Sequence, residues 1–281
     1  MYNRFVKLEM KFEMPLFYFC FTSNRHRTSN FHRRMDRREA FNKATLSCIT
    51  YLESFPECRN VNFQCGDGAA SHESLIWDKK NAPYKLPKDL RNFYSMFNGV
   101  HLSWNVDLGG RTVQIGEIRL NRMEAVKSLE IEGTFSTYSW NDSPSATLPD
   151  VRSSAAFILD SHCEVGDVVL LYRTKPSNKN TDDTSTSDSP ALESQGPQPP
   201  QESSCYEEPE IWFVDQSARW HYLCKSFTQY LRLLVVHLGV HGWQLVFTPE
   251  GLSSITENWM TMFCKERLII DRYWRERLLN S

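Results

Sequence analysis

The chain has 281 residues, of which 41% are hydrophobic, and a formal net charge of −2. A chain of this length can bury a substantial core, and we expect a single globular domain. The near-neutral charge argues against a general nucleic-acid-binding protein, because neutralising phosphates requires a basic excess on one face. The eight cysteines show no CxxC pair and no regular spacing, which is typical of proteins in a reducing compartment.

Residues 1–34 have weak periodicity and a basic balance, and we interpret them as a poorly ordered appendage. The apolar run at 15–21 (PLFYFCF) is similar to part of a targeting signal, but Glu9 and Glu13 interrupt the basic stretch before it and no small-residue cleavage site follows. No apolar run approaches the roughly 20 residues of a membrane-spanning helix. We therefore expect neither secretion nor contact with a membrane.

A helix is predicted to open the domain at residue 35. Asp36 with Glu39 has the spacing of a capping box. Apolar residues then recur at helical spacing until the break at 54–56, namely Phe41, Ala44, Leu46, Ile49 and Leu52. Next, apolar and polar residues alternate over 61–65, which predicts a partly buried edge strand.

The stretch 86–99 (LPKDLRNFYSMFNG) has residues typical of a helix start and a helix end. Pro87 suits the first helical position, and Asn98 with Gly99 suits the C-terminal cap. Alternating residues on either side of a Gly-Gly turn then predict a β-hairpin at 101–106 and 112–120. We also expect a short helix within 121–129 and two further strands, at 155–159 and 165–172.

Residues 174–209 are rich in Ser, Thr, Pro, Gln and Asp and carry more acids than bases, so we interpret them as a disordered acidic insert. A second hairpin is predicted at 211–214 and 220–223. Ser226 and Gln229 form a capping box for an apolar helix that ends near Gly239. The last predicted parts of the 35–264 domain are an apolar run at 243–247 and a helix with one apolar side, formed by Leu252, Ile255, Trp259 and Met262.

The C-terminal segment 265–281 is predicted to be an amphipathic helix. Its apolar stripe consists of Ile270, Tyr273, Trp274 and Leu278. Such a helix either packs back on its own domain or binds a groove in another protein. Tyr273 and Trp274 are therefore candidate partner contacts, because aromatic side chains supply much of the binding energy at interfaces.

Several blocks of the chain resemble the SMI/KNR-like (SUKH) superfamily over about residues 36–263. These blocks are LPKDLRNFYSMFNGVHLSW, FILDSHCEVGDVVLLY, EIWFVDQSARWHYLCKSF and RLLVVHLGVHGWQ. Within that superfamily they are similar to the subunit 2 family of tubulin polyglutamylase complexes. The resemblance implies an α+β fold in which helices pack against a mixed, mostly antiparallel sheet. Relatives carry a longer, Lys-rich C-terminal tail in place of 265–281.

The resemblance also implies a function as a non-catalytic adaptor or scaffold subunit that needs no cofactor. Its implied partners are the other subunits of the complex, including a separate tubulin-tyrosine-ligase-like glutamate ligase, and through them tubulin. The implied location is the cytoplasm and cytoskeleton, at centrosomes, basal bodies or cilia. The acidic insert is then either a plain linker or a mimic of acidic tubulin tails.

The residues themselves argue against a ligase. A glutamate ligase needs ATP, but the chain has neither GxxxxGK[ST] nor GxGxxG. Cys163 lies beside His162, but neighbouring residues on a strand point in different directions and no third orienting group is identifiable. His237 and His241 have the spacing of helical zinc ligands, but Gly239 lies between them and no further ligand is suitably placed. We therefore expect no catalytic, cofactor or metal site.

Four tryptophans and one hairpin turn have two possible roles. Trp104, Trp212, Trp220 and Trp243 are expected in the core, the alternative being that one or two line a partner groove. Asp215 and Arg219 flank the turn of the second hairpin, either as a turn-forming surface pair or as candidate partner contacts. Two other functions stay open. One is a generic SMI/KNR-like binding domain in another complex, and the other is a small hydrolase or transferase that uses Cys163 or a histidine.

Overall fold

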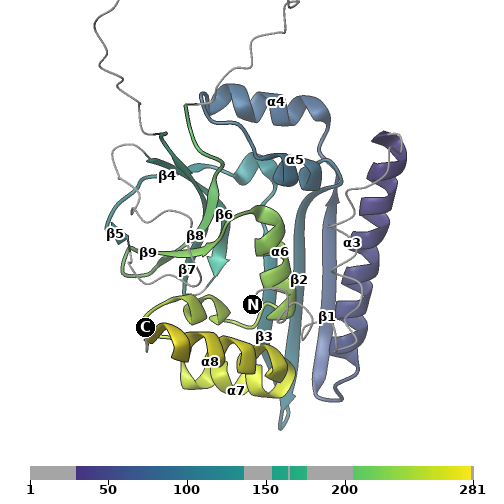
Figure 1. The fold of residues 1–281 in the computed structure, drawn as a ribbon. Helices are drawn as coiled ribbons and strands as arrows, with labels where there is room; N and C mark the ends of the chain where they lie inside the picture. Colours follow the sequence, from purple (N-terminus) through teal and green to yellow (C-terminus); the bar gives the residue numbers. More distant parts are fainter. Residues whose placement is uncertain (1–29, 136–153, 164, 176–204, 280–281) are drawn as a thin grey trace, which may run out of the picture.

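Two β-sheets and the helices packed against them make up the described part of the chain (Figure 1). The computed structural model describes residues 30–135, 154–163, 165–175 and 205–279. Most of the predicted N-terminal appendage and residues 176–204 of the predicted acidic insert lie outside these ranges. No helix within them is both long enough and apolar enough to cross a membrane.

The two sheets differ in size, and their strands are almost all antiparallel. The three-stranded sheet has the order β1-β2-β3, with β1 (Cys58–Asp67), β2 (Phe97–Leu108) and β3 (Arg111–Leu120). The six-stranded sheet has the order β4-β6-β7-β8-β9-β5, with β4 (Ser128–Leu129), β5 (Thr134–Phe135), β6 (Ser154–Cys163), β7 (Gly166–Arg173), β8 (Glu210–Asp215) and β9 (Arg219–Cys224). The parallel pairing of β5 with β9 makes this sheet mixed.

Helices lie at the periphery of the sheets and between them. The α-helices are α3 (Asn30–Glu53), α4 (Ser71–Lys80), α5 (Lys88–Tyr94), α6 (Phe227–Val236), α7 (Ser254–Phe263) and α8 (Lys265–Leu279). Two 3₁₀-helices, η1 (Met123–Ala125) and η3 (Trp243–Phe247), connect other elements. The α+β class expected from the sequence is therefore confirmed, but the expected single sheet is divided into two.

The three-stranded sheet buries one face. On β2, Leu102, Trp104 and Val106 are buried, whereas the alternating residues Ser103 and Asn105 are half-buried on the opposite face. This alternation follows from the two-residue period of a strand. The packing helices therefore lie on the side of Trp104, and the opposite face of the sheet is polar.

Trp104 fixes the local geometry on that buried face. Its indole Nε1 donates a hydrogen bond to the Leu238 carbonyl oxygen over 2.9 Å. Gly116 lies opposite Trp104 on β3, and a Cβ atom there would come within 2.0 Å of the same Nε1. Only glycine leaves room for the tryptophan ring at this position.

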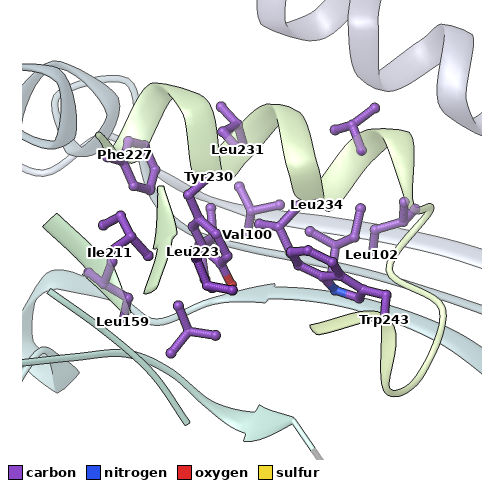
Figure 2. Close-up of a cluster of buried hydrophobic side chains, with 14 of the residues drawn as sticks. Val100, Leu102, Leu159, Ile211, Leu223, Phe227, Tyr230, Leu231, Leu234 and Trp243 are labelled. Carbon is purple, nitrogen blue, oxygen red and sulfur yellow. The ribbon is translucent and has the colours of Figure 1, made fainter. Parts of the chain in front are cut away.

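Helix α6 supplies much of the core (Figure 2). The Ser226 hydroxyl accepts a hydrogen bond from the Gln229 backbone N–H, and the Gln229 side chain accepts one from Lys225 N–H, as expected for the predicted cap. The buried side chains of this helix lie among residues from both sheets and from η3. Figure 2 labels Phe227, Tyr230, Leu231 and Leu234 of α6, and around them Val100, Leu102, Leu159, Ile211, Leu223 and Trp243.

A smaller second core lies against the six-stranded sheet. Trp212 and Trp220 are 3% and 1% exposed, and the Phe135 ring contacts both. Trp104 and Trp243 are 0% and 1% exposed in the main core. The expectation that these four tryptophans are core residues is thus confirmed.

Several sequence predictions were wrong in detail. The predicted cap at Asn98 and Gly99 lies inside β2, because helix α5 ends at Tyr94 and the chain extends at once to bury Phe97. Asp36 lies within α3 rather than at its start. The predicted helix within 121–129 is reduced to η1 followed by β4. Helix α4 was missed, since its sequence SHESLIWDKK has no apolar periodicity.

Helix α7 exposes half of the apolar residues that the sequence pattern assigned to the core side. Its buried residues are Thr256, Met260 and Phe263. Ile255 and Met262, which belong to the predicted apolar side, are 69% and 52% exposed. Ile255 and Met262 therefore face outward, whereas Leu252 and Trp259, the other two residues of that side, are partly buried against the main core.

The two ends of the predicted insert are joined at its base. Thr174, just after β7, and Tyr206, shortly before β8, form a β-bridge. Next to it, Arg173 Nη2 lies 2.7 Å from Glu210 Oε2, and both side chains are about nine-tenths buried. The chain on either side of residues 176–204 is therefore held in place by contacts among the described residues.

We predict that residues 176–204 can be replaced by a short Gly-Ser linker without unfolding the domain. The bridge and the Arg173–Glu210 ion pair stay intact, and shortening a loop changes its closure free energy only slightly, by about 0.6 kcal/mol per halving of its length. Thermal melting should show one cooperative transition within a few degrees of the parent chain. Loss of that transition would mean that the replaced residues contribute to the core.

Candidate functional site

Helix α8, which contains the predicted partner contacts, is attached to the domain by a buried cluster of charged residues. Asp271 is 2% exposed, and His237 at the end of α6 is fully buried. Asp271 Oδ2 lies 3.0 Å from His237 Nε2, and Arg267 Nη2 lies 2.6 Å from Asp271 Oδ1. The other imidazole nitrogen, Nδ1, is 2.7 Å from the Leu233 carbonyl oxygen and donates to it.

Burial and neighbouring charges shift the pKa values of this cluster in opposite directions. Burial alone would raise the pKa of Asp271, but Arg267 and His237 outweigh it and hold that pKa below its ordinary value. Burial lowers the pKa of His237 below its ordinary value, although Asp271 opposes the shift. Asp271 is therefore held as a carboxylate, and the cluster fixes α8 against α6.

Two more arginines hold α8 along its length. Arg272 donates to Glu257 on α7 over 2.6 Å, and Arg275 donates to the carbonyl oxygens of Thr248 and Pro249. Trp274 is half-buried against the main core. These contacts support the alternative in which the C-terminal helix packs back on its own domain.

The two predicted contacts on α8 have different environments. Tyr273 is 40% exposed, and its neighbour Ile269, one turn earlier, is 54% exposed. The Arg277 guanidinium carbon lies 5.8 Å from the ring centroids of both Tyr273 and Trp274, which is a cation–π distance. Ile269 and Tyr273 thus form an outward apolar pair, whereas truncating Trp274 would disturb the core.

The other predicted pair, Asp215 and Arg219, closes the β8–β9 turn. Asp215 accepts hydrogen bonds from the backbone N–H groups of Ser217 and Arg219 and from Arg219 Nε. Its Oδ2 lies 3.0 Å from Nε2 of the fully buried His221. Arg219 also contacts Glu250 in the loop before α7. The pair therefore shapes the turn and ties it to that loop.

The structure separates the two predicted pairs. Asp215 and Arg219 belong to the six-stranded sheet, whereas Tyr273 and Trp274 lie on the last helix. Sequence reasoning missed the cluster of His237, Arg267 and Asp271, although the i,i+4 spacing of Arg267 and Asp271 on one helix indicates an ion pair. The link to His237 joins residues 34 apart and leaves no local pattern.

Two clefts open on the surface of the described part of the chain. The larger, of about 140 Å³, lies between α7, α8 and the 250–252 loop. Its charged lining residues all have partners: Glu257 and Arg272 bind each other, Arg275 binds backbone, Glu250 binds Arg219 and Asp271 binds Arg267. The smaller, of about 10 Å³, has Trp243 and Gln244 in its lining. It has room for about one water molecule. Neither cleft has the size of a typical substrate site, roughly 300–1,000 Å³.

The residues weighed as catalytic or metal-binding lie on different elements of the fold. Cys163 is the last residue of β6, and its side chain lies outside the described part. His237 is engaged in the α8 cluster, while His241 lies in the turn that follows α6. Among the described residues there is no group of three His, Cys, Asp or Glu side chains that could hold a metal ion.

The fold and these sites define an α+β domain whose buried charged groups hold its own elements together and whose C-terminal helix presents an apolar pair to solvent. The chain belongs to the tubulin polyglutamylase complex subunit 2 family. It is 32% identical to the rat protein of that name over 241 residues, which cover 79% of this chain and 70% of the rat protein. It is 31% identical to the human protein over 236 residues, or 79% and 69%. No family model and no solved structure matches the chain.

We predict that Asp271→Asn destabilises the domain by about 3 kcal/mol, since breaking a buried ion pair leaves an uncompensated charge. Glu257→Gln, in the exposed pair with Arg272, is the matched control and should cost at most about 1 kcal/mol. Urea denaturation at neutral pH measures both. Equal, small effects would show that the Asp271 cluster does not hold α8.

Proposed function

We propose that this chain is a non-catalytic adaptor subunit of a tubulin polyglutamylase complex. The observation that carries the proposal is the family membership, at 31–32% identity over 79% of the chain. The proposed partners are the other subunits, among them a tubulin-tyrosine-ligase-like protein that joins glutamate to tubulin. The chain would reach microtubules in the cytoplasm, at centrosomes or cilia, through those partners.

The chemistry of the described residues supports an adaptor over an enzyme. Joining glutamate to a protein requires ATP with its Mg²⁺ ions, which are held by carboxylates and phosphate-binding loops. The buried carboxylates described above are engaged otherwise: Asp271 with Arg267 and His237, and Glu210 with Arg173. Such pairs hold the domain's own helices and strands in place and leave these carboxylates unavailable to Mg²⁺.

The outward face of α8 is the proposed partner surface. Ile269 and Tyr273 follow each other by one helical turn and are both exposed, while Leu268 and Asp271 on the opposite face are buried. A helix that is anchored on one side and presents Ile269 and Tyr273 on the other loses little conformational entropy when it binds. Tyr273 also presents an aromatic ring flanked by Arg277, and both residue types are enriched at binding hot spots.

We predict that Ile269→Asp with Tyr273→Asp weakens co-purification with the complex by about tenfold or more, a loss of roughly 1.4 kcal/mol per tenfold. Both side chains are exposed, so the melting temperature should stay within a few degrees. Leu75→Asp on α4 is the control, since Leu75 is 56% exposed and lies on a different helix. Unchanged co-purification of the α8 variant would show that the partner surface is not the outward face of α8.

We also predict that the purified chain alone incorporates no glutamate into tubulin with ATP and Mg²⁺, because the ligase is a different subunit. Incorporation should be measured with labelled glutamate, using the assembled complex as the positive control. Robust labelling by the isolated chain, undiminished by repurification, would contradict the adaptor function and favour an enzyme.

A further inference from the structure

An exposed apolar surface lies at one corner of the molecule, on elements other than α8. We call it the corner patch and define it as five of the ten large apolar residues that the described part of the chain exposes: Tyr51 (37% exposed), Leu108 (46%), Val113 (40%), Ile255 (69%) and Met262 (52%). They come from the end of α3, the β2–β3 hairpin and the outer stripe of α7.

Contacts beneath the surface join these residues into one patch. The Tyr51 hydroxyl donates to the Phe263 carbonyl oxygen over 2.8 Å, and the Phe263 ring packs against Phe55 and Trp259. Along α7, Trp259 follows Ile255 by four residues and Met262 follows it by seven, so the three side chains lie on one side of the helix. In Figure 1 the end of α3, helix α7 and the β2–β3 turn come together at the lower edge of the molecule.

The hairpin side of the patch is continuous with the same core. Val113 pairs with the buried Val106 across β2 and β3, and Val106 pairs with Cys58 on β1. Leu108 follows Val106 by two residues, so it lies on the same face of the sheet. This is the face on which α7 packs, since the Trp104 and Phe263 rings are 4.8 Å apart.

The chain contains an apolar segment that can cover this patch. Residues 15–21, with the sequence PLFYFCF, precede α3 and lie outside the described residues. The distance along α3 from Asn30 to Tyr51 is about 32 Å, at 1.5 Å per residue. Residues 15–21 lie nine to fifteen positions before Asn30, and so an extended chain carries them about 30–50 Å from it. The run therefore reaches the level of the corner patch.

We propose that the apolar run 15–21 binds the corner patch of its own chain. Each large apolar side chain that it buries contributes about 1.5–3 kcal/mol. Because the segment is covalently attached, its effective concentration at the patch is of the order of millimolar, so even weak intrinsic affinity keeps it bound. The patch is thereby withdrawn from other proteins, while the outward face of α8 stays available.

Oxidation of Met262 tests this proposal in the full-length chain. Dilute peroxide oxidises exposed methionines, Met262 lies within the patch, and the fully buried Met260 two residues away is an internal reference. We predict that Leu16→Ser with Phe17→Ser and Phe19→Ser raises the rate of Met262 oxidation about fivefold or more, as read by peptide mass spectrometry. Tyr2→Ser with Phe5→Ser, in the same segment but outside the run, should leave the rate at the parent value.

Three results would overturn the proposal. Equal rates in the parent chain and the triple variant would show that the run does not cover Met262. Equal acceleration by the control variant would show that cover comes from the segment as a whole. Protection of Met262 that disappears on dilution of the parent protein would identify a second copy of the chain as the occupant, since binding in cis is independent of concentration.

Discussion

Trp104 is the side chain on which the arrangement of sheets and helices depends. Its ring lies fully buried on β2, where glycine at position 116 makes room for it. Its Nε1 holds the Leu238 carbonyl just after α6, and its ring contacts Phe263 at the end of α7. One residue thus ties two strands to two helices. Because all these contacts lie on one face of the three-stranded sheet, the helices gather there and the opposite face is left polar.

Local patterns in the sequence predicted the elements they govern, and non-local contacts decided the rest. The Ser226 cap, both hairpins and the buried tryptophans follow from capping, turn and alternation patterns that act within a few residues. The helix cap expected at Asn98 and Gly99 failed because burial of Phe97 in β2 outweighed it. The division into two sheets has no local signal, since it depends on strand pairings between distant residues.

The contrast between local patterns and non-local contacts also explains how much of the candidate site was predictable. Hydrophobic periodicity predicted apolar stripes on α7 and α8, but it did not say which residues face the core, and the predicted α8 stripe did not include the exposed Ile269. On α8 the half-buried Trp274 and buried Asp271 turn inward, because Arg267 and His237 compensate the carboxylate. On α7 the buried residues are Thr256, Met260 and Phe263, so Ile255 and Met262 turn outward while Trp259 packs partly against the core. We assign a partner subunit to the outward face of α8, and the chain's own N-terminal run to the corner patch, which includes Ile255 and Met262 of α7.

The central claim is that this chain acts as a subunit held by the outer face of α8 within a polyglutamylase complex. Lysine cross-linking of the assembled complex, read by mass spectrometry, tests it most directly. Lys265 begins α8 and is exposed, whereas Lys79 and Lys80 lie on α4 at the other end of the molecule (Figure 1). The account predicts cross-links from Lys265 to another subunit. Cross-links to other subunits from Lys79 and Lys80 alone, with Lys265 linked only within its own chain, would contradict it.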